Sequence, residues 1–261
     1  MQKQPDKQRI VSVDMGLRNL SYSFLEYDYG NPDKIKVHGW KKLDLISMGS
    51  DLADRQNNFS VPACATIAHS LCSMFTSEFK PTTILLEQQR YRTGGSNAVQ
   101  EWTIRVNLLE AMMYATLYTL NQSQGSNVSV RSVSPKQVSL YLMATEETYQ
   151  EYLQTTLEKS TSKKKIATDI KPYNVSLNKP ELKAAKIQLM RSWIEDPAKA
   201  NLEFLDQALE TSAYFKPKDK KRKFSRKAPK LDDYADSLIQ GYTWIAWGNA
   251  LRQYEKEYQF K

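Results

Sequence analysis

The chain has 261 residues, of which 41% are hydrophobic and 25% are charged, and its formal net charge is +8. This composition is typical of a folded globular protein with a sizeable core, and the absence of a run of about eighteen apolar residues excludes a transmembrane helix. Two cysteines (Cys64 and Cys72) and two histidines (His38 and His69) are too few for a disulfide scaffold or a Cys/His zinc centre, so any metal is expected to have oxygen ligands.

The first ten residues are polar and match neither a signal peptide nor a transit peptide. After them the sequence predicts a β-hairpin, because Val11 and Val13 alternate with a serine, Gly16 permits a tight turn, and an aromatic-rich run follows. A third antiparallel strand is expected over residues 34–43.

The next elements are predicted by apolar spacing. A helix over 61–79 ends before Pro81, and a short buried strand follows over 82–89. The strongest helical pattern covers 98–121, where Asn97 and Gln100 form a capping-box pattern. The remaining expected elements are a strand over 127–135 and helices near 136–143, 181–195 and 233–257.

This order predicts an α/β fold, in which helices flank a mixed sheet. A single domain over 1–261 is expected, with a core of about 9–143 and 230–257. Residues 144–229 show weaker patterns and are interpreted as a helical and basic insertion region before the last helix.

The segment 216–230 contains nine Lys or Arg and one Asp, so it carries the whole net charge of the chain. Such a run is either a solvated loop or a segment that neutralises a polyanion such as nucleic acid.

Carboxylates occur at three element ends. Asp14 ends the first strand, Glu87 ends the buried strand, and Asp232, Asp233 and Asp236 lie at the start of the last helix. Sites in open α/β sheets gather beyond the carboxyl ends of strands, and clustered carboxylates suit Mg²⁺. Convergence of these residues would give a metal site that activates water for phosphodiester hydrolysis.

Each of these features has a structural alternative. The Asp-x-Gly of the first strand also occurs in ATP-using enzymes of the actin-like fold and in plain turns. The aspartates of the last helix are also typical of helix capping. The actin-like alternative requires a second glycine-rich phosphate loop, and Gly94–Gly95 is the only adjacent glycine pair.

Four segments resemble one family. They are VDMGLRNLSY, ILLEQQRYRTGG, EWTIRVNLLEAMMYA and DDYADSLIQGYTWIAW, and they are similar to the fungal mitochondrial Holliday junction resolvases, cruciform-cutting relatives of RuvC. The resemblance implies an RNase H-like fold with a five-stranded mixed sheet. It also implies a homodimer and a Mg²⁺-dependent endonuclease, with Mn²⁺ as a substitute, that makes paired nicks in four-way DNA junctions in mitochondria. No membrane and no small-molecule cofactor are expected. A catalytically inactive DNA-binding protein of the same fold is the alternative.

The resemblance also implies the site residues. Asp14, Glu87 and Asp236 match the family's acids, and either Asp232 or Asp233 matches the fourth, with the spacing favouring Asp233. Further residues are expected to contact DNA: Gln89, Arg90, Tyr91, Arg92, Lys163, Lys164, Lys165, Lys220, Lys221, Arg222 and Lys223. Guanidinium groups pair with phosphates and a tyrosine ring stacks on bases, although loop salt bridges would use the same residues. The helices at 98–121 and 238–251, the latter with Trp244 and Trp247, are expected to form core and part of a dimer interface.

Overall fold

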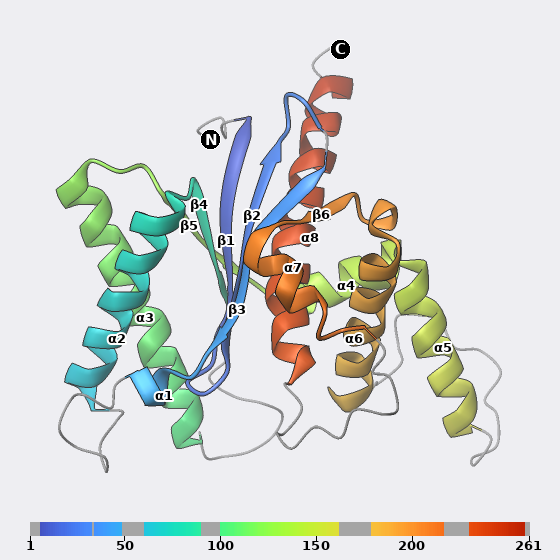
Figure 1. The fold of residues 1–261 in the computed structure, drawn as a ribbon, viewed down its shortest axis with the longest axis horizontal. Helices are drawn as coiled ribbons and strands as arrows, with labels where there is room; N and C mark the ends of the chain where they lie inside the picture. Colours follow the sequence, from blue (N-terminus) through green and yellow to red (C-terminus); the bar gives the residue numbers. More distant parts are fainter. Residues whose placement is uncertain are drawn as a thin grey trace.

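The computed structural model describes residues 6–32, 34–48, 60–89, 100–161, 179–216 and 230–258. Within these residues, six strands form one mixed sheet in the order β5-β4-β1-β2-β3-β6 (Figure 1). The strands are β1 (Lys7–Asp14), β2 (Leu20–Asp28), β3 (Ile35–Leu43), β4 (Thr83–Glu87), β5 (Ser129–Val133) and β6 (Leu202–Phe204). β1, β2 and β3 pair antiparallel, whereas β4 is parallel to both β1 and β5. The predicted mixed α/β architecture is therefore confirmed.

The sheet has one strand more than the five that were expected. β6 pairs in parallel with the beginning of β3, where Ile35 lies opposite Leu202. Three residues are too few to show the alternation that predicts a strand, so only the pairing reveals it. Because β6 comes from the 144–229 region, part of the expected insertion forms an edge of the sheet.

The helices lie on both faces of the sheet (Figure 1). They are α1 (Leu45–Met48), α2 (Val61–Met74), α3 (Glu101–Gln124), α4 (Pro135–Thr145), α5 (Glu147–Thr161), α6 (Lys179–Glu195), α7 (Asp206–Ser212) and α8 (Leu231–Tyr258), with a π-helical turn at Phe75–Phe79 and a 3₁₀ turn at Pro197–Lys199. The five predicted helices are all present with shifted ends, whereas α1, α5 and α7 were not predicted. No helix in the described ranges has the length and apolar character that a bilayer crossing requires.

The start of α3 differs from the prediction. The helix begins at Glu101, and Gln100 is its N-cap without a side-chain capping hydrogen bond. The predicted capping box is therefore wrong, because Gln100 lies before the helix rather than at its third position. Trp102 in the first turn is 44% exposed, while Val106, Leu109, Met113 and Leu117 form the buried stripe.

Two hydrophobic cores lie on opposite faces of the sheet. On one face Val11 and Val13 of β1 contribute to the core under α2 and α3. On the other face Ile10 of β1 and Trp40 of β3 contribute to the core formed with α4 to α8. Trp244 and Trp247 pack against this second core, and Trp247 meets the ring of Tyr141 edge-on. These two tryptophans therefore contribute to packing within the chain.

α8 is held on the sheet by buried hydrogen bonds as well as by apolar packing. Gln240 donates its side-chain amide to the Ser12 hydroxyl of β1 at 3.1 Å and to the Val13 carbonyl at 3.3 Å. On β2, Ser21 and Ser237 join their hydroxyls at 2.9 Å, and Ser23 donates to the Ser237 carbonyl at 3.0 Å. Directional bonds of this kind fix the rotation of the helix about its own axis.

α8 approaches the sheet closely at Gly241. A Cβ atom at this position would lie 2.6 Å from Leu25 Cδ1 and 3.2 Å from Ser12 Cβ. We therefore expect Gly241→Ala to destabilise the protein by about 1–2 kcal/mol, because overpacking outweighs the gain in helix propensity. Urea unfolding measures this loss. Gly39→Ala in β3 is the control, since its Cβ would meet Phe24 and Phe79 only at ordinary contact distances of 3.6–3.7 Å, and an equal loss in both variants would contradict the close approach at Gly241.

Candidate active site

Two strand ends place Asp14 and Glu87 side by side. β1 and β4 are parallel, with Val13 opposite Leu86, and each acidic residue is the next residue of its strand. The two side chains share a hydrogen bond. The expected meeting of these carboxylates at the carboxyl edge of the sheet is therefore observed.

The first turns of α8 bring Asp236 to the same edge. Gln240, one turn later on the same helix face, bonds to β1 and so positions Asp236 beside Asp14. Asp14, Glu87 and Asp236 line one small cavity together with Pro135, Val138, Lys186 and Gln240. We call the three carboxylates of this cavity the acidic centre.

The carboxylates of the acidic centre repel one another. Burial raises the pKa of Asp14 well above its ordinary value, and the negative charges of Glu87 and Asp236 raise it further. Asp233 adds a smaller contribution of the same sign. A bound cation would relieve this repulsion, so the electrostatics of the centre favour one.

Each of the three aspartates of α8 has a lysine partner. Asp232 meets Lys183 at 2.5 Å, Asp233 meets Lys42 at 3.6 Å, and Asp236 meets Lys186 at 2.5 Å. These distances join a lysine Nζ to a carboxylate oxygen.

The partners separate the roles of Asp232 and Asp233. Burial opposes ionisation of Asp232, but the hydrogen bond and charge of Lys183 lower its pKa overall. Burial raises the pKa of Asp233, and the charge of Asp232 raises it further. Of these two residues, only Asp233 adds to the raised pKa of Asp14, but neither lines the cavity, so Asp233 as the fourth acid stays a prediction from the residue spacing.

Lys186 is a member of the site that the sequence did not indicate. It comes from α6, which crosses beside α8, and its side chain is 13% exposed. Burial alone would lower its pKa, but the charges of Asp236 and Glu87 raise the net value. A lysine in a lysine-rich helix carries no distinguishing sequence signal, so its position could come only from the packing of α6 against α8.

Glu87 is also oriented by neighbours. The Gln89 side-chain amide donates to Glu87 Oε2 at 3.0 Å, and the Gln89 backbone N–H donates to Glu110 Oε2 on α3 at 3.3 Å. Burial raises the pKa of Glu110, and the Glu87 charge raises it as well. Glu110 is thus a further carboxylate near the centre that sequence reasoning missed.

Gln89 was predicted to contact DNA, and here its side chain supports Glu87. The other predicted DNA contacts, at 90–92, 163–165 and 220–223, lie outside the described residues.

The donor set fits Mg²⁺ or Mn²⁺ in its chemistry. The donors are carboxylate oxygens, as hard divalent ions prefer, and their mutual repulsion is the condition that a cation relieves. The side chains are not pre-arranged for it: among the described residues, no three Asp, Glu, His or Cys side chains are already grouped to hold a metal ion. The ammonium group of Lys186 instead supplies the positive charge at Asp236.

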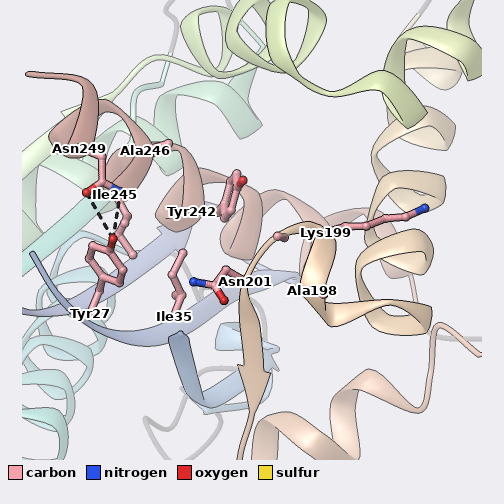
Figure 2. Close-up of a pocket in the computed structure, with 10 residues that line it drawn as sticks. Tyr27, Ile35, Ala198, Lys199, Asn201, Tyr242, Ile245, Ala246 and Asn249 are labelled. Atoms are coloured by element: carbon pink, nitrogen blue, oxygen red, sulfur yellow. Dashed lines mark hydrogen bonds between the residues drawn. The ribbon is translucent and has the colours of Figure 1, made fainter. Parts of the chain in front are cut away.

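A larger cavity, of about 190 Å³, is lined by residues of the sheet and of α8 (Figure 2). Tyr27 and Ile35 of the sheet, Asn201, and Tyr242 and Asn249 of α8 contribute to its lining. Tyr27 pairs with Gln8 near the start of β1, so this cavity is remote from Asp14. Two polar residues of its lining, Tyr27 and Asn249, form hydrogen bonds of 3.2–3.3 Å with each other. No acidic residue lines this cavity.

The chain thus combines a mixed sheet with acidic residues at the ends of two parallel strands and on a helix that packs against the sheet. Residues 10–254 match the family described as mitochondrial resolvase Ydc2 / RNA splicing MRS1, and the chain belongs to this family.

Individual relatives agree with this assignment. The chain is 27% identical over 246 residues to the mitochondrial cruciform cutting endonuclease 1 of Schizosaccharomyces pombe, covering 94% of this chain and 81% of the relative. The fold matches the crystal structure of the yeast mitochondrial Holliday junction resolvase Ydc2 with a TM-score of 0.65 and 24% identity, over 100% of this chain and 87% of the other. The predicted resemblance and fold class are confirmed.

The repulsion at the acidic centre gives a prediction for the metal-free protein. Because the folded state raises the pKa of Asp14, the unfolded state loses this proton first, and the folded protein loses stability as pH rises from about 4 toward the folded pKa. We expect Asp14→Asn in EDTA to raise Tm at pH 7 by about 2–4 °C, the shift that ~1 kcal/mol gives in a protein of this size. The gain should shrink toward pH 4. Calorimetry at both pH values measures it, and a lower Tm at pH 7 would contradict the repulsion.

Proposed function

We propose that the protein is an endonuclease that resolves four-way DNA junctions by hydrolysing a phosphodiester at the acidic centre. The observation that carries the proposal is the convergence of Asp14, Glu87 and Asp236 in one cavity at the carboxyl edge of the sheet. Membership of a family whose description names a mitochondrial resolvase, and 27% identity to a cruciform cutting endonuclease over 94% of this chain, support this substrate.

Asp14, Glu87, Asp236 and Asp233 are the residues that would hold Mg²⁺ or Mn²⁺. When bound, such an ion lowers the pKa of water and stabilises the leaving oxygen of a phosphodiester. The protein positions the carboxylates for this: β1 and β4 fix Asp14 and Glu87, Gln89 orients Glu87, and the Gln240 contacts fix Asp236. Asp232 is proposed to lie outside this set, because its carboxylate pairs closely with Lys183.

The proposal extends to the assembly and its location. A four-way junction is cut symmetrically by two active sites, so a two-fold homodimer is proposed, and this matches the common symmetry of nucleic-acid enzymes with symmetric targets. The names of the family and of the fission-yeast relative support a mitochondrial location. A single nuclease domain over the chain is proposed, since the family match runs from residue 10 to 254.

A second candidate function is nucleic-acid binding without cleavage. The family description includes an RNA-splicing protein beside the resolvase, so membership alone is compatible with both. The presence of all three carboxylates in one cavity favours the nuclease, because a binding protein does not need a partly buried, mutually repelling acidic set.

Cleavage of a synthetic four-way junction with Mg²⁺ tests the nuclease. We expect symmetric nicks from the wild type, and a loss of at least about 100-fold in rate for Asp14→Asn and Asp236→Asn, since metal-assisted stabilisation is worth several kcal/mol. Asp232→Asn should retain the rate within about tenfold, because its carboxylate pairs with Lys183 away from the cavity. Gel-shift assays in Ca²⁺ control for binding. Tight binding without nicks by the wild type would instead establish the second candidate.

The basic segment 216–230 gives an independent prediction. Replacing Lys220, Lys221, Arg222 and Lys223 together by Gln should weaken junction binding and reduce the slope of log Kd against log salt by about 3, close to the value for four phosphate contacts. Fluorescence anisotropy between low and moderate salt measures the slope. A slope equal to that of the wild type would show that this segment is a solvated loop.

A further inference from the structure

One lysine differs from the others that pair with α8. Lys183 meets Asp232 with a side chain that is 52% exposed, and Lys42 meets Asp233 at 3.6 Å, which is a loose contact. Lys186 is 13% exposed, contacts Asp236 at 2.5 Å, and lines the same cavity as Asp14 and Glu87. Its ammonium group is therefore inside the acidic centre, whereas Lys183 pairs with an aspartate that does not line the cavity.

The groups around Lys186 favour pairing of its ammonium group with the carboxylates of the acidic centre. Tyr149 of α5 is fully buried, which raises the pKa of its hydroxyl group, and the positive charge of Lys186 acts to lower that pKa. Against the effect of burial, the negative charges of Asp236 and Glu87 raise the pKa of Lys186. A buried ammonium group without an anionic partner is strongly unfavourable, and so is a set of crowded carboxylates without a cation. In the protein without metal, the positive charge of Lys186 and the negative charges of the acidic centre therefore compensate each other.

We propose that Lys186 is the internal cation of the acidic centre, and that a divalent metal ion competes with its ammonium group for Asp236. This inference rests on the proposed function, because it takes Asp236 as a metal ligand. Two cations on one carboxylate repel each other, so metal binding requires the ammonium group to withdraw or to share Asp236 at a cost. Lys186 is accordingly a positioning residue that sets the affinity of the centre for metal.

The competition predicts two effects of opposite sign for one substitution. Lys186→Met keeps a straight side chain of similar length and removes the charge. Without metal the acidic centre loses its counter-charge, so we expect Tm in EDTA to fall by about 5–10 °C. With metal the competitor is gone, so we expect Mn²⁺ to bind more tightly, by on the order of tenfold in Kd. A residue with only a structural role would lower Tm and would not tighten metal binding.

Lys183→Met is the matched control. It removes a lysine from the same helix that also pairs with an aspartate of α8, but this pair lies outside the cavity and Lys183 is half-exposed. The Asp232 side chain is itself only 14% exposed, so we expect the Tm of Lys183→Met in EDTA to fall, but by less than that of Lys186→Met, and its Mn²⁺ affinity to stay within about twofold of the wild type. The measurements are calorimetric melting in EDTA and isothermal titration with MnCl₂, both without DNA.

The double variant Lys186→Met/Asp236→Asn keeps the test decisive if Lys186→Met does not fold in EDTA. It removes both charges of the pair, and we expect its Tm to return to within about 3 °C of the wild type. A double variant as unstable as the single variant would overturn the proposal, because Lys186 would then act through packing. Unchanged or weaker Mn²⁺ binding by Lys186→Met would also overturn it.

Junction nicking by the wild type in the same MnCl₂ series separates the two proposals. Wild-type nicking and Mn²⁺ binding, with no gain of affinity in Lys186→Met, would overturn only the role of Lys186. A wild type that binds the junction but neither binds Mn²⁺ nor nicks would overturn the metal-dependent nuclease and the competition together.

Discussion

The docking of α8 on the sheet is the constraint on which the rest of the site depends. Three serines of β1 and β2 lie under this helix, where a sheet would ordinarily present apolar side chains, and they bond to Ser237 and Gln240. Apolar packing alone would hold the helix on the sheet but would tolerate small rotations, whereas buried hydrogen bonds lose their energy when the geometry changes. The register of these bonds decides which aspartate of α8 faces Asp14. Gly241 allows the helix to come close enough for the bonds to form.

The electrostatics of the site follow from this docking. Once Asp236 is fixed beside Asp14 and Glu87, three carboxylates share a small cavity, and their repulsion is a cost that the folded protein must offset. Lys186 offsets part of it from α6, and Lys42 and Lys183 do the same for the two neighbouring aspartates. The helices of the 144–229 region thus contribute charge to the centre as well as packing. These ion pairs help to stabilise the crowded carboxylates in the folded protein.

The 144–229 region also has a structural part. β6 extends the sheet beside β3, and α7 packs against β3 through Gln207, which donates to the Trp40 carbonyl at 2.7 Å and accepts from the Trp40 backbone N–H at 2.6 Å. Trp40 in turn donates its indole N–H to the Tyr234 carbonyl of α8 at 2.9 Å. The region therefore supports the helix that carries the aspartates. Family membership agrees with this continuity, since the match extends from the first strand through this region to α8.

The sequence by itself determined the class of the fold, the first five strands, the long helices and the acidic residues of the centre. It could do so because alternation, helical spacing and the positions of carboxylates at element ends are local properties of the chain, and the family segments are local as well. The tertiary structure alone decided the rest. It placed Lys186 in the acidic centre, paired Lys183 with Asp232, added β6 to the sheet, and packed Trp244 and Trp247 against the core. The physical reason is that each of these depends on a contact between segments far apart in the chain, such as the 50 residues that separate Lys186 from Asp236, and no local pattern encodes which of several similar side chains makes it.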